Sequence, residues 1–374
     1  MDTPSDFDIF LVCPPGLEPL LAAEARENGF APAEPLKGGV LIRGSWAEVW
    51  RANLQLRCAT RVLARIASFR AMHLAQLDKR ARRVPWAELL RKDVPVRVEV
   101  ACRKSRIYHA GAAAQRIERA IAEELGAPIV SEATEGAVQV KARIEDDLCE
   151  ISVDTSGESL HKRGHKPAVG KAPLRETMAA LFLRQCGFAG REPVVDPMCG
   201  SGTFVIEAAE IAAGFAPGRS RSFAFEDLAG FDATGWAALR GAAQRTIPDQ
   251  RFYGYDRDQG AISMSSQNAV SSGVAGVTEF ACQPISDLVP PPGPAGLVMV
   301  NPPYGARIGN RNLLFGLYGT LGSVLKQRFS GWRVGLVTSD AGLARTTELP
   351  FLPNGPTIDH GGLRIRLYRT DTLP

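Results

Sequence analysis

The stretch that decides the fold is "VVDPMCGSGTF" (Val194–Phe204). Two valines lead to an acidic residue, Asp196, and Gly200 and Gly202 then flank a serine before an apolar run with helical spacing. This order predicts a buried strand, a tight glycine turn and the start of a helix. Glycines in such a turn let a ligand approach the backbone and the helix N-terminus. The stretch therefore predicts an α/β sheet that binds its ligand at the carboxyl end of a strand.

Strands and helices alternate around this stretch, over residues 174–374. The alternation predicts a doubly wound, mostly parallel sheet of the Rossmann-like class. The dinucleotide fingerprint is not met, because its third glycine position holds Val205. Residues 216–236 lengthen the gap between Gly202 and the next strand, so we expect them to form an insertion.

Two further acidic residues follow predicted strands in the order that a nucleoside ligand requires. Asp256 comes after "FYGY", and its carboxylate could accept hydrogen bonds from ribose hydroxyls. Asp287 follows the next strand, and the resemblance of the glycine turn to motif I of class I methyltransferases implies that this position binds an adenine amino group. Each acid alone is more often an ordinary carboxylate in a strand-end loop. The candidate cofactor-binding residues are Asp196, Cys199, Gly200, Gly202, Asp256, Ser286, Asp287 and Asn301.

The stretch "VMVNPPYG" (Val298–Gly305) predicts a core strand that ends at Asn301, because proline cannot donate to a sheet. Its N-P-P-Y sequence resembles motif IV of methyltransferases that act on exocyclic or amide nitrogens. The glycine turn resembles motif I of class I S-adenosylmethionine (SAM) methyltransferases. A plain strand-ending turn is the alternative.

An aromatic amine is a poor nucleophile, because its lone pair is delocalised into the ring. The side-chain oxygen of Asn301 and the carbonyl of Pro302 could accept hydrogen bonds from the amine and orient that lone pair for in-line transfer. Tyr304 could stack on a base that has been taken out of its helix. We expect Asn301, Pro302 and Tyr304 to be the catalytic residues.

The composition limits the class of protein. The chain has 374 residues, of which 45% are hydrophobic and 22% charged, as in globular proteins of two or three domains. Its seven cysteines form no CxxC pair and its five histidines are dispersed. These patterns predict neither disulfides nor a metal site and favour the cytoplasm. Without a signal peptide or an apolar run of roughly 18 residues, we expect no membrane contact, and we expect a monomer.

Positive charge is concentrated in one segment. Between Arg51 and Arg106 there are 15 Lys and Arg but 4 Asp and Glu, whereas residues 176–374 hold 17 of each sign. The excess predicts a polyanion partner, most simply nucleic acid, although a solvated face of unpaired arginines fits equally well. Residues 156–173 are rich in Gly, Lys, Arg and His and are interpreted as a linker that could touch the ligand. The candidate RNA contacts are Arg80, Arg82, Arg83, Arg103, Lys104, Arg106, Lys162, Arg163 and Lys166.

Short strands, helices and a hairpin alternate in the first third of the chain. We expect small α+β modules there rather than one continuous sheet. The stretch "VRVEVACRKSRIYHAGAAAQRIERAIAEELG" (residues 96–126), with the hairpin after it, resembles a THUMP domain that runs into its linker. With "DPMCGSGTF" and "NPPYG" downstream, nearly the whole chain resembles the THUMP-containing RNA guanine-N2 methyltransferases, in particular the bacterial 23S rRNA enzymes of the RlmL type.

This resemblance implies a domain order. Residues 1–50 would form a ferredoxin-like α+β piece, 51–156 a THUMP domain that engages RNA, 157–173 a basic linker, and 174–374 a Rossmann-like methyltransferase domain with a seven-stranded sheet. It implies that SAM donates a methyl group to N2 of a guanosine, most simply in 23S rRNA, leaving S-adenosylhomocysteine (SAH).

Two alternatives stay open. An enzyme of the same architecture could methylate guanine N2 in tRNA, and a non-catalytic RNA-binding or ribosome-assembly factor could keep the fold with a vestigial pocket. The second predicts eroded glycines or a broken NPPY, and neither is seen. One departure is Ala306, where the family pattern has a glutamate. Some relatives carry a second methyltransferase domain; because this chain ends at Pro374, we expect one activity.

Overall fold

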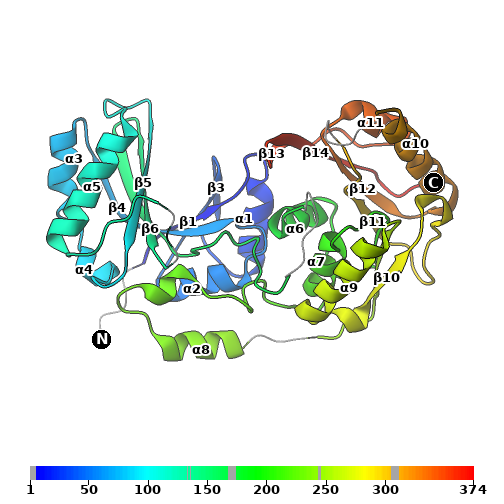
Figure 1. Ribbon diagram of the computed structural model, residues 1–374, viewed down its shortest axis with the longest axis horizontal. Coiled ribbons are helices and arrows are strands. Elements are labelled where there is room, and N and C mark those ends of the chain that lie inside the picture. The colour runs from blue at the N-terminus through cyan, green and yellow to red at the C-terminus, as the bar shows by residue number, and fades with distance from the viewer. Residues whose placement is uncertain (1–5, 133, 135, 167–173, 243–245, 305–310) are drawn as a thin grey trace. The chain divides into compact units, whose positions relative to one another are not determined.

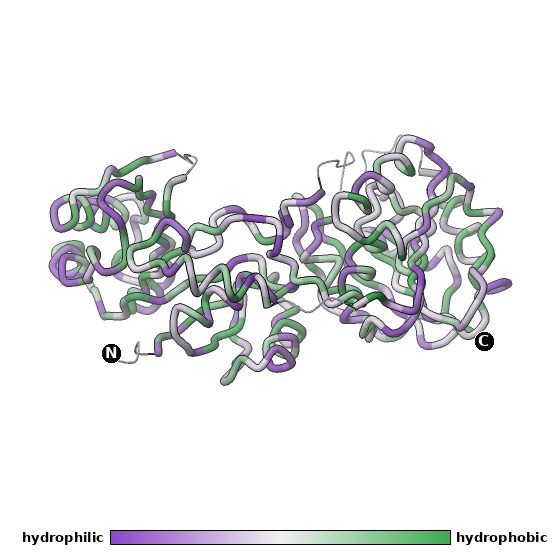
Figure 2. The backbone as a smooth tube through the Cα atoms, turned by 90° about the horizontal axis from the view of Figure 1, so that it is seen from below, coloured by the Kyte–Doolittle hydropathy of each residue, from purple (hydrophilic) through white to green (hydrophobic). Residues whose placement is uncertain are grey.

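The computed structural model describes residues 6–132, 134, 136–166, 174–242, 246–304 and 311–374. Two compact units are formed, each around a sheet of seven strands (Figure 1). The first unit contains Met1–Cys13, Ala22–Leu160 and Arg221–Ala242, and the second contains Pro14–Leu21, His161–Ser220 and Ala243–Pro374. Within each unit, hydrophobic stretches run through the interior and hydrophilic stretches lie mainly outside (Figure 2). Among the described residues, no helix is long and apolar enough to span a membrane.

The sheet of the first unit has the strand order β2-β3-β1-β4-β7-β6-β5. Its strands are β1 (Phe7–Val12), β2 (Glu34–Leu36), β3 (Gly39–Gly44), β4 (Arg61–Arg70), β5 (Val96–Arg103), β6 (Val138–Glu145) and β7 (Leu148–Asp154). The helices of this unit are α2 (Trp46–Gln55), α3 (Leu74–Ala81), α4 (Trp86–Leu89), α5 (Ala110–Glu124), η1 (Ala224–Asp227) and α8 (Ala233–Gly241), and α1 (Glu18–Glu27) belongs to it from Ala22 onward.

The expectation of separate small modules was wrong. Strand β4 pairs with β1 on one side and with β7 on the other, so the N-terminal strands and the later ones share one sheet. Only β5 and β6 run parallel, and the other neighbours are antiparallel. Buried side chains alternate along β4, with Val62 and Ala64 fully covered, as expected of a strand with one core-facing side.

Part of the predicted insertion belongs to the first unit. The rings of Phe223 and Phe225 stack at 5.2 Å, and Trp236 meets Phe225 edge-on at 4.9 Å. Trp50 of α2 meets Phe231 at 5.8 Å, and α8 lies beside α2 (Figure 1). Aromatic pairs of this geometry add stabilisation beyond the area that they bury. Residues 221–242 are therefore a structural part of this unit, although the chain reaches them from the second.

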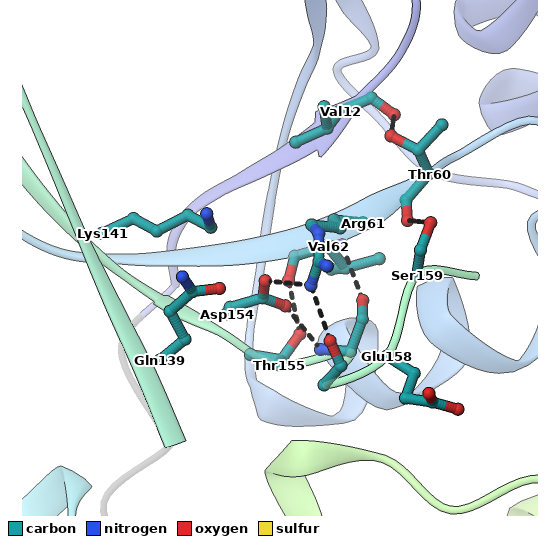
Figure 3. Close-up of polar contacts among 12 residues, drawn as sticks. Val12, Thr60, Arg61, Val62, Gln139, Lys141, Asp154, Thr155, Glu158 and Ser159 are labelled. Atoms are coloured by element: carbon teal, nitrogen blue, oxygen red, sulfur yellow. Dashed lines mark hydrogen bonds and ion pairs between the residues drawn. The ribbon is translucent and has the colours of Figure 1, made fainter. Parts of the chain in front are cut away.

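A buried polar network lies at the end of β7 in the first unit (Figure 3). Asp154 is fully buried and accepts a hydrogen bond from Nη1 of Arg61 at 2.5 Å. Burial raises the pKa of Asp154, and the charge of Arg61 opposes that shift. The hydroxyl of Thr155 donates to the Val62 carbonyl at 2.7 Å, and Arg221 donates to the carbonyls of Ser156, Glu158 and Ser159. The network fixes the chain just before it enters the second unit.

The sheet of the second unit has the strand order β10-β9-β8-β11-β12-β14-β13. Strands β10, β9, β8, β11 and β12 run parallel, and β14 is antiparallel to both neighbours. The strands are β8 (Val194–Asp196), β9 (Phe252–Asp256), β10 (Thr278–Cys282), β11 (Leu297–Val300), β12 (Arg333–Thr338), β13 (Thr357–His360) and β14 (Leu363–Arg369). The predicted doubly wound sheet of seven strands is confirmed.

Helices cover both faces of this sheet. They are α6 (Glu176–Gln185), α7 (Thr203–Ala212), α9 (Gln259–Ser272), α10 (Arg311–Arg328) and α11 (Ala341–Thr346), with short 3₁₀ turns η2 (Ala275–Val277) and η3 (Ile285–Asp287). Strand β11 is buried along its whole length, as its continuous apolar sequence predicts. Tyr318 and Leu325 of α10, and Phe329 directly after it, pack with β11 and β12 in one core cluster.

Candidate functional site

The predicted site residues meet at the carboxyl edge of the second sheet. Asp196 ends β8, Asp256 ends β9, and Asn301 directly follows β11. Strand β8 lies between the other two and is in register with both, through the pairs Asp196 with Gly254 and Val195 with Val298. The parallel strands therefore carry the three side chains to one edge, as the sequence predicted.

The glycine turn is tight on one side and open on the other. Gly200 and Gly202 have φ angles of +54° and +81°, which residues other than glycine rarely adopt. A Cβ on Gly202 would lie 3.0 Å from Cβ of Ser265, whereas a Cβ on Gly200 would meet no atom within 4 Å. The turn thus packs against α9 at Gly202 and leaves space above Gly200 for a ligand, next to the N-terminus of α7.

Asp256 connects the glycine turn to the end of β9. Its Oδ2 accepts the Gly200 N–H at 3.1 Å, and its Oδ1 accepts the Asp258 N–H at 3.0 Å. A carboxylate offers about four acceptor positions, so each oxygen keeps one for a hydroxyl group. The structure therefore fits a ribose acceptor at Asp256 and shows a second task, which is to hold Gly200 in place.

Asp196 and Cys199 lie beneath the turn and are nearly inaccessible. Oδ1 of Asp196 accepts the Met198 N–H at 3.1 Å. Burial raises the pKa of Asp196 well above its usual range, and the charge of Asp256 raises it further. Burial also raises the pKa of the Cys199 thiol, so this thiol stays neutral. Both side chains are placed to support the turn from below.

The loop after β10 carries Ser286 and Asp287 within η3. Both are exposed, and the Ser286 hydroxyl donates to Oδ1 of Asp287 at 3.0 Å. Arg328, at the end of α10, donates from Nη1 to the carbonyls of Ser286 and Leu288 at 2.9 and 2.8 Å. Arg328 could not be identified from the sequence, because it lies 40 residues after Leu288 and reads only as a basic residue at a helix end.

The NPPY turn offers an acceptor that has no donor. Oδ1 of Asn301 is buried and has no hydrogen-bond partner among the residues that the structure describes. The hydroxyl of Tyr318 lies 3.4 Å from the Pro303 carbonyl and 3.3 Å from Oγ1 of Thr338, and this holds the turn against β12.

The rest of the turn is partly covered. Pro302 is buried and Tyr304 half-buried, and burial raises the pKa of the Tyr304 phenol. Both proline rings and the Tyr318 contact restrict the turn. Ala306, at the position of the expected glutamate, lies outside the described residues.

Six of the predicted RNA contacts lie in the first unit, on the segment that runs from α3 to the start of α5. Arg80 and Arg83 are exposed, and Arg106 is ion-paired loosely, 3.8 Å from Asp147. Arg82 is different, because Asp78, Glu123 and Glu124 surround it at 2.5 to 3.1 Å. These hydrogen bonds raise the pKa of Arg82, so the guanidinium stays charged. The three carboxylates around it offset that positive charge. Arg82 is therefore a poorer phosphate ligand than its sequence context suggested.

Two predicted RNA contacts in the linker are not at a surface, and their assignment is corrected. Arg163 pairs with Glu207 of α7 at 3.1 Å, and both side chains are only 2% exposed. Lys166 is 3.0 Å from Glu176 and donates to the Thr203 hydroxyl at 2.5 Å. A buried cation needs such partners to offset its desolvation. These residues tie the linker to α7, whereas Lys162 is exposed.

No group of three or more potential metal ligands occurs in the described part of the chain. All seven cysteines are free thiols.

Comparison with known proteins identifies relatives of both regions. Residues 163–349 match the family described as RMKL-like, methyltransferase domain, and residues 8–63 match the RlmL ferredoxin-like domain. The protein slr0064 of Synechocystis sp., whose name contains the words RNA methyltransferase, is 30% identical over 362 residues, which cover 95% of this chain and 94% of the relative.

Longer relatives match over part of their length. The ribosomal RNA large subunit methyltransferase K/L of Syntrophotalea carbinolica is 35% identical over 364 residues, which cover 92% of this chain and 50% of the relative. The chain thus spans about half the length of that relative. The crystal structure of SMU.472 complexed with SAH is similar over the full length of both chains, with a TM-score of 0.85 and 25% identity.

Proposed function

Because the chain belongs to the family of RMKL-like methyltransferase domains, we propose that it methylates the exocyclic N2 of a guanosine in the RNA of the large ribosomal subunit. The methyl donor is SAM, and the products are the N2-methylated guanosine and SAH. The chain spans about half the length of the large-subunit enzymes that it matches. We therefore assign to it the activity of the matching half.

The observation that carries the proposal is that Oδ1 of Asn301 is buried and has no hydrogen-bond partner in the described part of the chain. A buried acceptor without a donor costs ~1–3 kcal/mol, so such an atom calls for a partner that arrives with the substrate. An exocyclic amine supplies an N–H for it. Asn301 directly follows β11, at the edge that holds the glycine turn, and this supports a position beside the proposed cofactor site.

The residues present fit SAM. The open space above Gly200 accommodates the amino-acid part, Asp256 keeps acceptor positions for the ribose, and Ser286 with Asp287 offers acceptors to the adenine amino group. When bound, SAM supplies an electrophilic methyl group on its sulfonium. Asp256 and Asp287 also suit the positive charge of that sulfonium.

The chain's own groups then orient the amine. Asn301 Oδ1 and the Pro302 carbonyl accept its two N–H bonds, which directs the nitrogen lone pair away from them. Tyr304 stacks on the extruded base. A strong general base is not needed, because the proton becomes acidic only as the new N–C bond forms. The neutral phenol of Tyr304, whose pKa is raised, keeps this pocket free of a competing negative charge.

RNA binding in this proposal falls mainly to residues 51–156, which we assign as a THUMP domain. The exposed Arg80, Arg83, Arg103, Lys104 and Arg106 contact phosphates there, and Lys162 adds to them. We place the protein in the cytoplasm, with its RNA substrate and its reduced cysteines, and we expect it to act as a monomer.

The first test replaces Asn301. We expect Asn301→Ala to abolish methyl transfer and to leave SAH affinity within a few-fold, because Oδ1 is the acceptor for the amine and the other candidate cofactor-binding residues stay in place. Asn301→Asp keeps an acceptor oxygen and should retain part of the activity. Single-turnover transfer of labelled methyl and calorimetric SAH binding measure the two effects, and retained turnover in Asn301→Ala would remove this residue from its role.

The second test identifies the RNA. After deletion of the gene, mass spectrometry of purified rRNA and tRNA should show one N2-methylguanosine missing from 23S rRNA. An unchanged rRNA with a tRNA mark lost would move the substrate to tRNA. Failure of the purified chain to bind SAH in calorimetry would instead support a non-catalytic RNA-binding factor.

A further inference from the structure

A surface of the first unit carries an exposed aromatic ring, Tyr108, among three of the proposed RNA contacts, and the roles given above do not use that ring. We define the Tyr108 patch as Met72, Arg103, Lys104, Arg106 and Tyr108, which lie between the end of β5 and the start of α5 and on the segment after β4. Tyr108 is 84% exposed and Met72 is 42% exposed. No hydrogen bond within the described residues involves the Tyr108 hydroxyl. The ring therefore contributes little to the core of this unit.

The loop that carries the ring is braced. The Arg106 N–H donates to Oδ1 of Asp147 at 2.8 Å, in the turn between β6 and β7. The Asp147 N–H donates to the Ser105 hydroxyl at 3.0 Å, and this hydroxyl donates to the Arg103 carbonyl at 2.9 Å. Nη1 of Arg106 also lies 3.3 Å from the sulfur of Met72. The backbone is thus fixed on both sides of Lys104, and the ring is presented to solvent by a held loop.

Basic side chains surround the ring. Arg103 and Arg106 are 53% and 72% exposed, and their acidic partners Glu145 and Asp147 are 3.7 and 3.8 Å away. Lys104 is exposed and has a φ angle of 46°, a strained conformation for a lysine. Exposed ion pairs at these distances contribute little, so the cations remain available to a polyanion.

An exposed aromatic ring among cations matches the chemistry of a single nucleotide. The ring offers a face on which any base can stack, and the cations pair with the flanking phosphates. A base inside a duplex has both faces covered by its neighbours, so only an unpaired nucleotide can use such a ring. The carboxylates of an acidic protein partner would pair with the arginines, but they would offer no flat group to stack on the tyrosine ring.

We propose that the Tyr108 patch binds an unpaired nucleotide of the RNA substrate, with its base stacked on the Tyr108 ring and its phosphates held by Arg103, Lys104 and Arg106. The identity of the polyanion as RNA rests on the proposed function. The inference adds that the substrate presents a single-stranded segment to the first unit, in addition to the guanosine that reacts in the second.

The experiment measures binding to a fluorescein-labelled single-stranded oligoadenylate and to an RNA duplex of the same length by fluorescence polarisation. We expect Tyr108→Ala to weaken single-strand binding ~5- to 100-fold, the range for loss of one base stack. Tyr108→Phe keeps the ring and should bind as the wild type does. Lys92→Ala removes an exposed cation before the start of β5 and serves as the matched control, with an unchanged stack.

A spectroscopic signature separates stacking from charge. An oligonucleotide with 2-aminopurine in place of one adenine should lose fluorescence on binding to the wild type and to Tyr108→Phe, and should keep it with Tyr108→Ala. Equal single-strand affinity in Tyr108→Ala and wild type, absence of single-strand binding by the wild type, or a wild-type preference for duplex would each overturn the proposal.

SAH affinity, measured on the same variants, keeps the two proposals distinguishable. Normal SAH binding with no effect of Tyr108→Ala on RNA rejects the patch and leaves the methyltransferase proposal intact. A Tyr108-dependent RNA complex in a protein that binds no SAH supports the patch and rejects the catalytic proposal.

Discussion

At the scale of single residues, Arg328 shows how a side chain outside the site can set its shape. One guanidinium nitrogen spans the carbonyls of Ser286 and Leu288, on either side of Asp287. Charge-assisted hydrogen bonds of this kind are stronger than neutral ones. The loop that carries Ser286 and Asp287 is therefore held by the last turn of α10.

Replacement of Arg328 should weaken cofactor binding. We expect Arg328→Ala to lower SAH affinity ~10-fold, which corresponds to the loss of about one charged hydrogen bond, and to leave the maximal rate at saturating SAM almost unchanged. Lys326→Ala is the matched control, because Lys326, on the same helix, pairs with the exposed Glu348 at 2.6 Å. A loss of maximal rate at saturating SAM, without a loss of affinity, would contradict this positioning role.

The residue scale also shows what sequence can and cannot foresee. Asp196, Asp256 and Asn301 were predictable, because each follows its own strand and parallel strands end at one edge. Arg328 was not, because its contact depends on how α10 packs. Arg163 was misassigned for the same reason: its partner Glu207 is 44 residues away, and a basic residue in a linker carries no sign of burial.

At the scale of elements, the insertion after α7 completes the first unit. Phe225 is buried among Phe223, Phe231, Trp236 and Trp50 of α2. The sequence predicted an insertion but gave no partner for it, because aromatic residues at irregular spacing do not reveal which surface they cover. In the same way, the alternation in the first third predicted strands correctly and could not show that β4 joins two groups of strands into one sheet.

Removal of the Phe225 ring should therefore destabilise the first unit. We expect Phe225→Ala to cost ~3–5 kcal/mol, as for other large-to-small core substitutions. Hydrogen exchange should accelerate in α2 and β4, and SAH affinity, a property of the second unit, should stay near that of the wild type. Val289→Ala, at an exposed apolar position of the second unit, is the control. Faster exchange confined to β8, β9 and β11 would contradict the assignment of the insertion to the first unit.

At the scale of the whole molecule, stability should depend on the protonation of His161. Burial lowers the pKa of His161 from 6.5 to about 4, and Glu176 opposes the shift. Because the unfolded chain binds this proton more readily, His161 favours the folded state above pH 6.5. That contribution falls as the pH drops from 6.5 towards 4.

The urea midpoint of the wild type should decrease through this pH window more steeply than that of His161→Gln. Carboxylates titrate at the lower end in both proteins, so the difference between the two slopes isolates the histidine. Parallel curves for wild type and variant would show that His161 keeps an ordinary pKa in the folded chain.

The division of the chain between its units has a consequence for biosynthesis. The first unit draws its last segment, Arg221–Ala242, from beyond the glycine turn, and the second draws Pro14–Leu21 from near the start. Neither unit is one continuous piece of chain. During translation, the aromatic partners of Trp50 are synthesised more than 150 residues after it, so the surface of α2 that they cover stays exposed until then. We therefore expect the nascent chain to bind a chaperone during its synthesis.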